Sequence, residues 1–182
     1  MKRLAITLLI LIAGLTCLIL VSTKVSGQTT ETITYDVSCD GRTFAINQVH
    51  DGNPSIQRGD TFLLSGNIYA GNTIPAGGTR QDPSPFGPDH SGAVGTWICR
   101  GVFLAGGDSF KTEKIQRATT QYFVLTDKSR LFTEGFEGPI VTTRAVVGGI
   151  GTHAGARGTA TMERIGINKT GSYNLRIVFT LE

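Results

Sequence analysis

The sequence is short of the features that mark several protein classes. It holds one tryptophan, two methionines, six prolines and three cysteines in 182 residues, and 17% of its residues are charged. No basic run follows the first residues, so the sequence predicts no contact with nucleic acid or with anionic lipid. No segment beyond residue 31 shows a helical stripe of ten or more residues and no internal repeat is visible, which disfavours helical bundles and repeat arrays.

Motifs of three site classes are also missing. No Gly-x-Ser-x-Gly elbow is present, and this disfavours a hydrolase with a nucleophilic triad. His50, His90 and His153 lie far apart and lack metal-ligand spacing, so no metal site is expected. The glycine-rich residues 148–151 are not followed by a helical pattern, which excludes a dinucleotide-binding turn.

The N-terminus has the pattern of an export signal. Lys2 and Arg3 precede residues 4–21, which carry no charge, and residues 25–27 are small enough for a cleavage site. This order predicts a cleaved signal peptide over residues 1–27 and a secreted or extracytoplasmic protein. An uncleaved membrane anchor is the alternative, because the uncharged stretch approaches the roughly 20 residues that span a bilayer.

The remaining residues 28–182 suit one domain. Removal of the signal takes away three basic residues and no acidic ones, which leaves 14 of each sign and a net charge of zero. A domain of this size buries roughly two thirds of its unfolded surface, so it needs no metal to fold.

Two covalent modifications are suggested. Cys39 and Cys99 survive removal of the signal, and in an oxidising compartment such a pair commonly forms a disulfide. The alternative is two buried thiols, because sequence does not give their separation.

Asn168 begins an Asn-Lys-Thr glycosylation sequon, which matters only on a eukaryotic secretory route. The turn in which it lies explains the asparagine equally well.

Apolar residues alternate with polar ones through most of the mature chain. The clearest case is residues 173–181, and alternation of this kind predicts strands with one dry face. Turn residues separate the strands, which leaves a closed barrel or a sandwich. The predicted strands are 32–37, 44–48, 61–70, 94–104, 116–126, 130–136, 141–147, 158–165 and 173–181.

One connection is long. Residues 71–92 are rich in glycine and proline, and loops of this length are often functional or disordered. We expect this segment either to cover a cavity at a barrel mouth or to be a mobile surface loop.

The segment 146–158 carries a family resemblance. It reads VVGGIGTHAGARG and resembles the signature hairpin VVGGTGxFxxARG of plant dirigent proteins and the GGxGxFxGxxG pattern of allene oxide cyclases. Residues 59–71, 95–103 and 130–135 resemble other strands of these proteins in the same order. The resemblance implies an all-β, eight-stranded antiparallel β-barrel of the calycin type, with an apolar cavity, no cofactor, and assembly as a homotrimer or homodimer.

The resemblance also has gaps. Ser65 and Gly66 stand where dirigent proteins carry paired acids, and His153 replaces the usual aromatic residue of the hairpin, while Arg157 is kept. These departures put the guidance of radical coupling in doubt.

The candidate site residues combine this resemblance with the strand pattern. A buried arginine must be paired, and a paired arginine could polarise a ligand oxygen. A structural salt bridge or an exposed strand face is the alternative for each arginine. The candidate catalytic residues are Arg157, Tyr69 and Glu134, and the candidate ligand contacts are Arg100, Asn67, Trp97 and His153.

Three functional hypotheses follow. The first is a barrel that binds a small hydrophobic molecule and acts as a cofactor-free isomerase, cyclase or stereochemical guide, by confinement and orientation. The second is a carrier or extracellular interaction module without catalysis. The third is a barrel filled by its own side chains that acts through oligomer surfaces.

Overall fold

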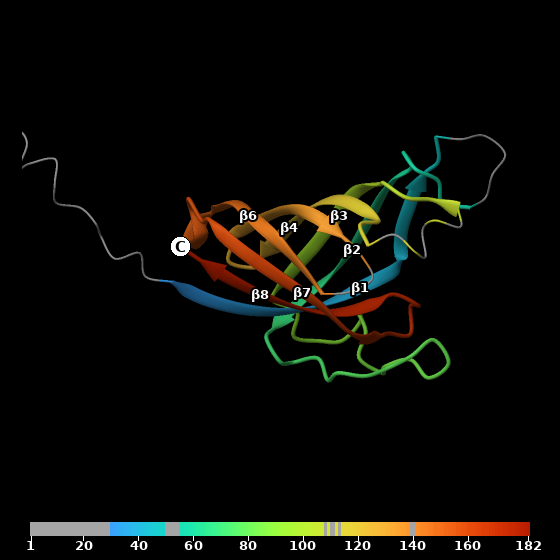
Figure 1. Ribbon diagram of the computed structural model, residues 1–182. Coiled ribbons are helices and arrows are strands. Elements are labelled where there is room, and N and C mark those ends of the chain that lie inside the picture. The colour runs from blue at the N-terminus through green and yellow to red at the C-terminus, as the bar shows by residue number, and fades with distance from the viewer. Residues whose placement is uncertain (1–29, 50–54, 108, 110–111, 113, 139–140) are drawn as a thin grey trace, which may run out of the picture.

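The computed structural model describes residues 30–49, 55–107, 109, 112, 114–138 and 141–182. They form one closed antiparallel barrel in which each strand pairs with its sequence neighbours and β8 closes on β1 (Figure 1). The strands are β1 (Glu31–Asn47), β2 (Thr61–Ala70), β3 (Gly95–Phe103), β4 (Arg117–Leu125), β5 (Arg130–Glu137), β6 (Thr142–Ile150), β7 (Gly158–Ile167) and β8 (Tyr173–Leu181). The predicted eight-stranded barrel is confirmed, and the sandwich alternative is excluded.

Strand β1 joins two segments that the sequence predicts as separate strands, 32–37 and 44–48. The pairing with β2 shifts between Asp40 and Ala45, so the strand carries a bulge there and continues. Thr43 stabilises the bulge, because its hydroxyl accepts a hydrogen bond of 2.9 Å from the backbone amide of Ser65. A bulge bends a strand without ending it, which explains why turn-like residues occur inside this one.

The barrel interior is apolar toward the end that holds the β6–β7 hairpin. Phe179 packs edge-on against Phe123 at 4.9 Å between ring centroids and against Tyr35 at 6.1 Å. Leu131 and Ile177 join this cluster, and neither is exposed. Rings at these separations and angles attract one another beyond simple burial, so this end of the barrel is filled.

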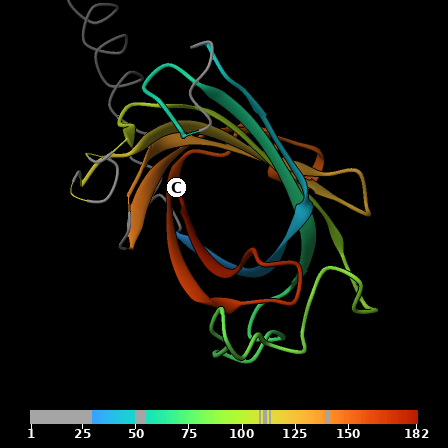
Figure 2. The ribbon, with the colours of Figure 1, turned by 90° about the vertical axis from the view of Figure 1, so that its right-hand side faces the viewer.

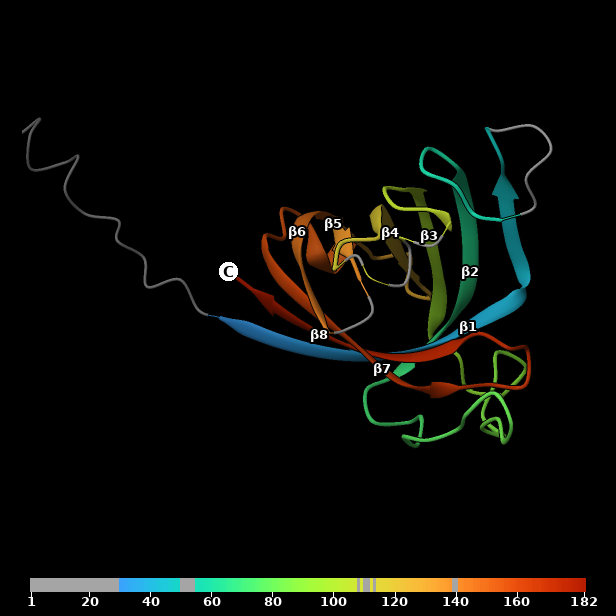
Figure 3. The same cartoon turned by 45° about the vertical axis from the view of Figure 1, so that its right-hand side comes forward.

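The long connection between β2 and β3 lies outside the barrel. Figure 2 looks along the barrel into the end opposite that hairpin, and the green segment lies outside the ring of strands. Figures 1 and 3 place it on one side, next to β1, β7 and β8. Ile74 and Phe86 of this segment form a second apolar cluster with Tyr69 and Ile165. The segment therefore packs mainly against the outer wall, and only Arg80 among its residues lines the pocket at the barrel end that is described below.

The predicted disulfide is wrong. Cys39 and Cys99 are both buried free thiols. Cys39 pairs with Gly66 of β2, and Cys99 pairs with Leu64 on the other side of that strand. One intervening strand separates β1 from β3 by roughly 9–10 Å, beyond the roughly 7 Å that a disulfide bridges. Burial raises the pKa of both thiols, which keeps them protonated and unreactive.

The predicted signal peptide over residues 1–27, and with it the predicted export, lies outside the described residues. Within the described part of the chain, no helix has the length and the hydropathy needed to cross a membrane.

Candidate functional site

A layer of polar side chains lies inside the barrel, on the wall formed by β4, β5 and β6. Arg144 of β6 is its centre, and this side chain has no exposed surface. Its guanidinium donates to the Glu137 carboxylate at 3.0 Å, to the Thr133 hydroxyl at 3.1 Å and to the Thr119 carbonyl at 2.7 Å. Because an unpaired buried charge is costly, these partners allow an arginine to occupy the core.

Glu137 is held as tightly as Arg144. Its Oε1 atom accepts hydrogen bonds from the Thr119 hydroxyl at 2.9 Å and from the Gln121 amide at 2.8 Å, in addition to Arg144. Burial lowers the pKa of Arg144, and the charge of Glu137 opposes that shift. This polar layer differs from the apolar cavity that the family resemblance implies.

An open pocket lies beyond the polar layer, at the end of the barrel away from the β6–β7 hairpin. We call it the end pocket, and its volume is about 580 Å³. Apolar and aromatic side chains supply much of its wall, and three arginines also reach it. The residues that line it are Gly41, Phe44, Ile56, Leu64, Arg80, Phe103, Gln116, Arg117, Arg164, Thr170, Gly171, Ser172 and Tyr173.

The pocket and the interior hold polar atoms without partners. In the described part of the chain, the buried side-chain atoms without a hydrogen bond are Trp97 Nε1, Arg117 Nε, Gln121 Oε1 and Thr142 Oγ1. Buried polar groups normally find a partner. Arg117 lines the end pocket, and Trp97 and Gln121 occupy the barrel interior. A bound molecule entering from the pocket could satisfy Arg117 first.

Two predicted site residues, Tyr69 and Asn67, face the outer wall. The Tyr69 hydroxyl donates to the carbonyl of His90 at 2.9 Å, and the Asn67 amide donates to the carbonyl of Pro88 at 2.6 Å. Burial raises the pKa of Tyr69, so the phenol stays protonated. Both side chains fasten the long connection, and neither lines the end pocket.

Arg100 and Glu134 lie on the opposite outer wall. Both line a shallow groove of about 800 Å³ that crosses β2 to β6 and also includes Phe136 and Val147. Arg100 lies over the ring of Tyr122 at 5.5 Å. Phe136 is 56% exposed and Val147 is 39% exposed, so the groove presents apolar side chains to solvent.

The remaining predicted site residues separate from one another. His153 ends the short helix η2 (Gly151–His153) in the β6–β7 hairpin, and Arg157 is exposed beside it and donates to the carbonyl of Ala156 at 2.8 Å. Trp97 alone among the predicted residues occupies the barrel interior. In the described part of the chain, no three His, Cys, Asp or Glu side chains gather as metal ligands would.

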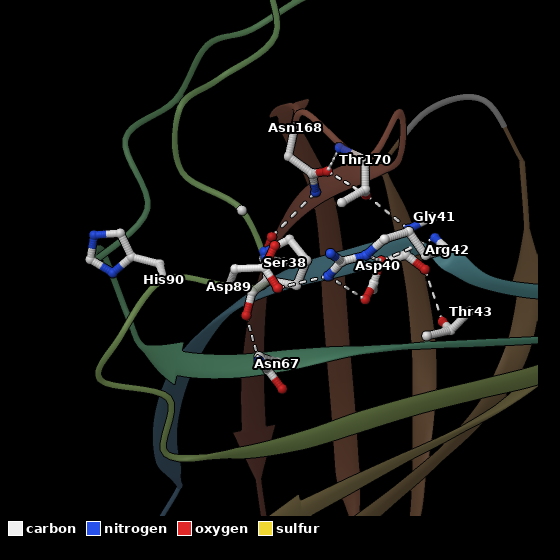
Figure 4. A network of polar contacts seen from close by, with 12 residues as sticks. Ser38, Asp40, Gly41, Arg42, Thr43, Asn67, Asp89, His90, Asn168 and Thr170 are labelled. Carbon is white, nitrogen blue, oxygen red and sulfur yellow. Dashed lines mark hydrogen bonds and ion pairs between the residues drawn. The ribbon is translucent and has the colours of Figure 1, made fainter.

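The outer wall near the pocket rim holds a second polar network (Figure 4). Asn168 is fully buried, and its amide donates to the carbonyl of Cys39 at 2.9 Å and to Ser38 and Asn174 at 3.2 Å. A side chain held in this way is not accessible to glycosylation. Arg42 bridges Asp40 and Asp89, and thereby ties the long connection to β1.

The residues that the sequence analysis missed are the interior charges Arg117, Arg164 and Glu137. A usable signal is present in the sequence, because each lies in phase with apolar residues of its own strand. Arg117 is in phase with Phe123, and Glu137 with Leu131. Where the inward-facing positions of a strand change from apolar to polar residues, the pattern indicates a polar layer in the interior.

Comparison of the sequence alone identifies no relative: no family model matches the chain, and no curated protein matches it. Comparison of the structure does find similar folds. Pyocyanin demethylase superimposes with a TM-score of 0.54 at 17% identity, over 84% of this chain and 100% of that one. The pterocarpan synthase dirigent protein GePTS1 gives 0.55 at 14% identity, over 84% and 83%. The dirigent protein PsPTS1 gives 0.56 at 12% identity, over 85% and 94%. The chain therefore has the dirigent-type barrel fold.

Proposed function

We propose that the protein binds a small, largely apolar molecule in the end pocket and holds it in one orientation. The observation that carries this proposal is the combination of apolar walls with a buried guanidinium nitrogen of Arg117 that makes no hydrogen bond. Ligand sites are typically concave, mostly apolar, and equipped with a few polar groups that fix orientation. The volume of about 580 Å³ lies within the usual range of such sites.

The similar folds are named as enzymes, a demethylase and two synthases. This favours a reaction on the bound molecule, in which the barrel contributes confinement and orientation. A carrier without catalysis is the second candidate, and one observation favours it. The described residues that line the end pocket include no Asp, Glu or His, so none of these usual proton acceptors faces the bound molecule.

We expect the replacement Leu64→Arg to weaken binding of an uncharged apolar dye, N-phenyl-1-naphthylamine, about tenfold or more. Leu64 lines the pocket, and a charged side chain there removes apolar wall and fills space. Leu63→Arg is the matched control, because Leu63 is the next residue of β2 and is 47% exposed outside the barrel. Dye fluorescence gives the affinity of each variant, and circular dichroism checks the fold.

Equal binding by the two variants would contradict the proposal, as would loss of binding in the Leu63 variant alone. Phe44→Arg serves as a second pocket variant, since Phe44 lines the pocket and is 44% exposed. Native mass spectrometry of the purified protein would show any co-purified ligand. A carrier would return this ligand chemically unchanged after incubation, whereas an enzyme would convert it to a product of different mass or structure. The same spectra count the copies per assembly, which we propose to be more than one because of the apolar outer groove.

A further inference from the structure

Three cationic side chains reach the end pocket, from three separate parts of the chain. Arg117 begins β4, Arg164 lies near the end of β7, and Arg80 belongs to the long connection. None of the described residues that line the pocket is acidic. The pocket is therefore apolar in its walls and positive in its charge.

The interior carboxylate of Glu137 balances only part of this charge. The Oε1 atom of Glu137 is committed to Arg144 and to two neutral donors. Its Oε2 atom lies 3.8 Å from Nε of Arg117, which is too long for a hydrogen bond. One carboxylate thus faces two guanidinium groups, and within the described part of the chain Arg164 has no acidic partner.

Aromatic rings hold these arginines in place without using up their donors. Arg164 lies over the ring of Tyr173 at 4.3 Å, and one of its nitrogens donates to the carbonyl of Gly138 at 3.2 Å. Arg117 lies about equally far from the rings of Phe62, at 5.9 Å, and Phe103, at 6.0 Å. A guanidinium has five N–H donors, so each arginine keeps several for a ligand. Stacking on an aromatic face fixes the plane of the group.

We propose that the ligand of the end pocket is an amphiphilic carboxylate, whose carboxylate group binds Arg117 and Arg164 and whose aromatic or alkyl body packs on Leu64, Phe103 and Tyr173. This inference rests on the proposed function, because it names the chemical class of the molecule bound there. A planar carboxylate offers two oxygens to a guanidinium in matching geometry. A phosphate or sulfate ester would also seek cations, and the experiment separates these classes.

The test compares 4-phenylbutanoate with its uncharged amide, 4-phenylbutanamide, by calorimetric titration of the purified protein. The carboxylate is expected to bind about 10- to 100-fold more tightly than the amide, because hydrogen bonds to charged groups are the stronger ones. Arg117→Gln is expected to remove most of this preference and to leave the affinity for the amide unchanged. Arg117→Lys is expected to keep part of the preference for the carboxylate, because the charge remains while the bidentate hydrogen-bond geometry is lost.

Two further variants test whether the preference for the carboxylate depends on the arginines of the pocket. Arg164→Gln is expected to reduce the preference in the same way, and it serves if Arg117→Gln does not fold. Arg100→Gln removes a cation from the outer groove and is expected to leave the preference unchanged.

Equal affinity for carboxylate and amide would overturn the inference while leaving the proposed function in place, because the amide still binds. Failure of both compounds and of the uncharged dye to bind would overturn the proposed function itself. Tighter binding of 4-phenylbutyl phosphate than of the carboxylate would overturn the assignment to carboxylates.

Discussion

Replacement of Glu137 with glutamine is expected to lower the free energy of unfolding by about 3–5 kcal/mol, the usual cost of removing one partner of a buried ion pair. Arg144 keeps its hydrogen bonds to Thr133 and Thr119. Its charge, however, stays fully buried without a counter-charge, and a second guanidinium, that of Arg117, lies nearby. Urea unfolding followed by circular dichroism measures the loss.

Glu134→Gln is the matched control for this change. Glu134 lies on the same strand as Glu137 but is exposed on the outer wall, so its replacement is expected to alter stability by less than about 0.5 kcal/mol. The double replacement Glu137→Leu with Arg144→Met is expected to recover much of the loss, because a packed apolar pair can substitute for a buried ion pair. Similar stability losses in the two single variants would contradict the structural role given to the polar layer.

Replacement of Gly158 with alanine is expected to cost about 3 kcal/mol or more, through backbone strain and overlap together. Gly158 begins β7 with φ of +133°, a backbone conformation that favours glycine. A Cβ atom here would also overlap the carbonyl oxygen of Thr180 and lie 3.1 Å from the Cα atom of Leu181. Neither neighbour can withdraw, because both belong to β8, which pairs with β7 and β1.

A second variant, at Gly155 of the same hairpin, distinguishes the cost of backbone strain from the cost of steric overlap. Its φ is +77°, and a Cβ atom there would have no neighbour within 4 Å, so Gly155→Ala is expected to cost only about 1–2 kcal/mol. Thermal unfolding of the two variants under one condition compares them. If both alanines cost the same, close packing of β7 on β8 is not what requires the glycine of the Ala-Arg-Gly motif.

The fold was largely predictable because it rests on local patterns. Alternation with a period of two marks β8 as clearly in the sequence as in the structure, where Leu175, Ile177 and Phe179 are buried. The bulge of β1 was not predictable, since Asp40 and Gly41 look like turn residues unless the pairing with β2 is known. The disulfide was predicted wrongly because strand pairing separates the two cysteines. The sequence does not show that β2 lies between Cys39 and Cys99.

The site was predicted poorly for a related reason. The family resemblance directs attention to the β6–β7 hairpin and to Tyr69, and the structure places these residues at the far end of the barrel or on its outer wall. Which charged residues meet inside depends on how the strands are staggered, and this brings Thr119 opposite Gly135 and places Arg117 opposite Glu137. Sequence separation carries little information on such contacts.

The account depends most on the end pocket being the place where a ligand binds. Nuclear Overhauser contacts between the phenyl protons of bound 4-phenylbutanoate and the protein report this location directly. The account predicts contacts to Leu64, Phe103 and Tyr173 at the open end of the barrel. Contacts to Phe136 and Val147 of the outer groove, without any to the pocket residues, would contradict it.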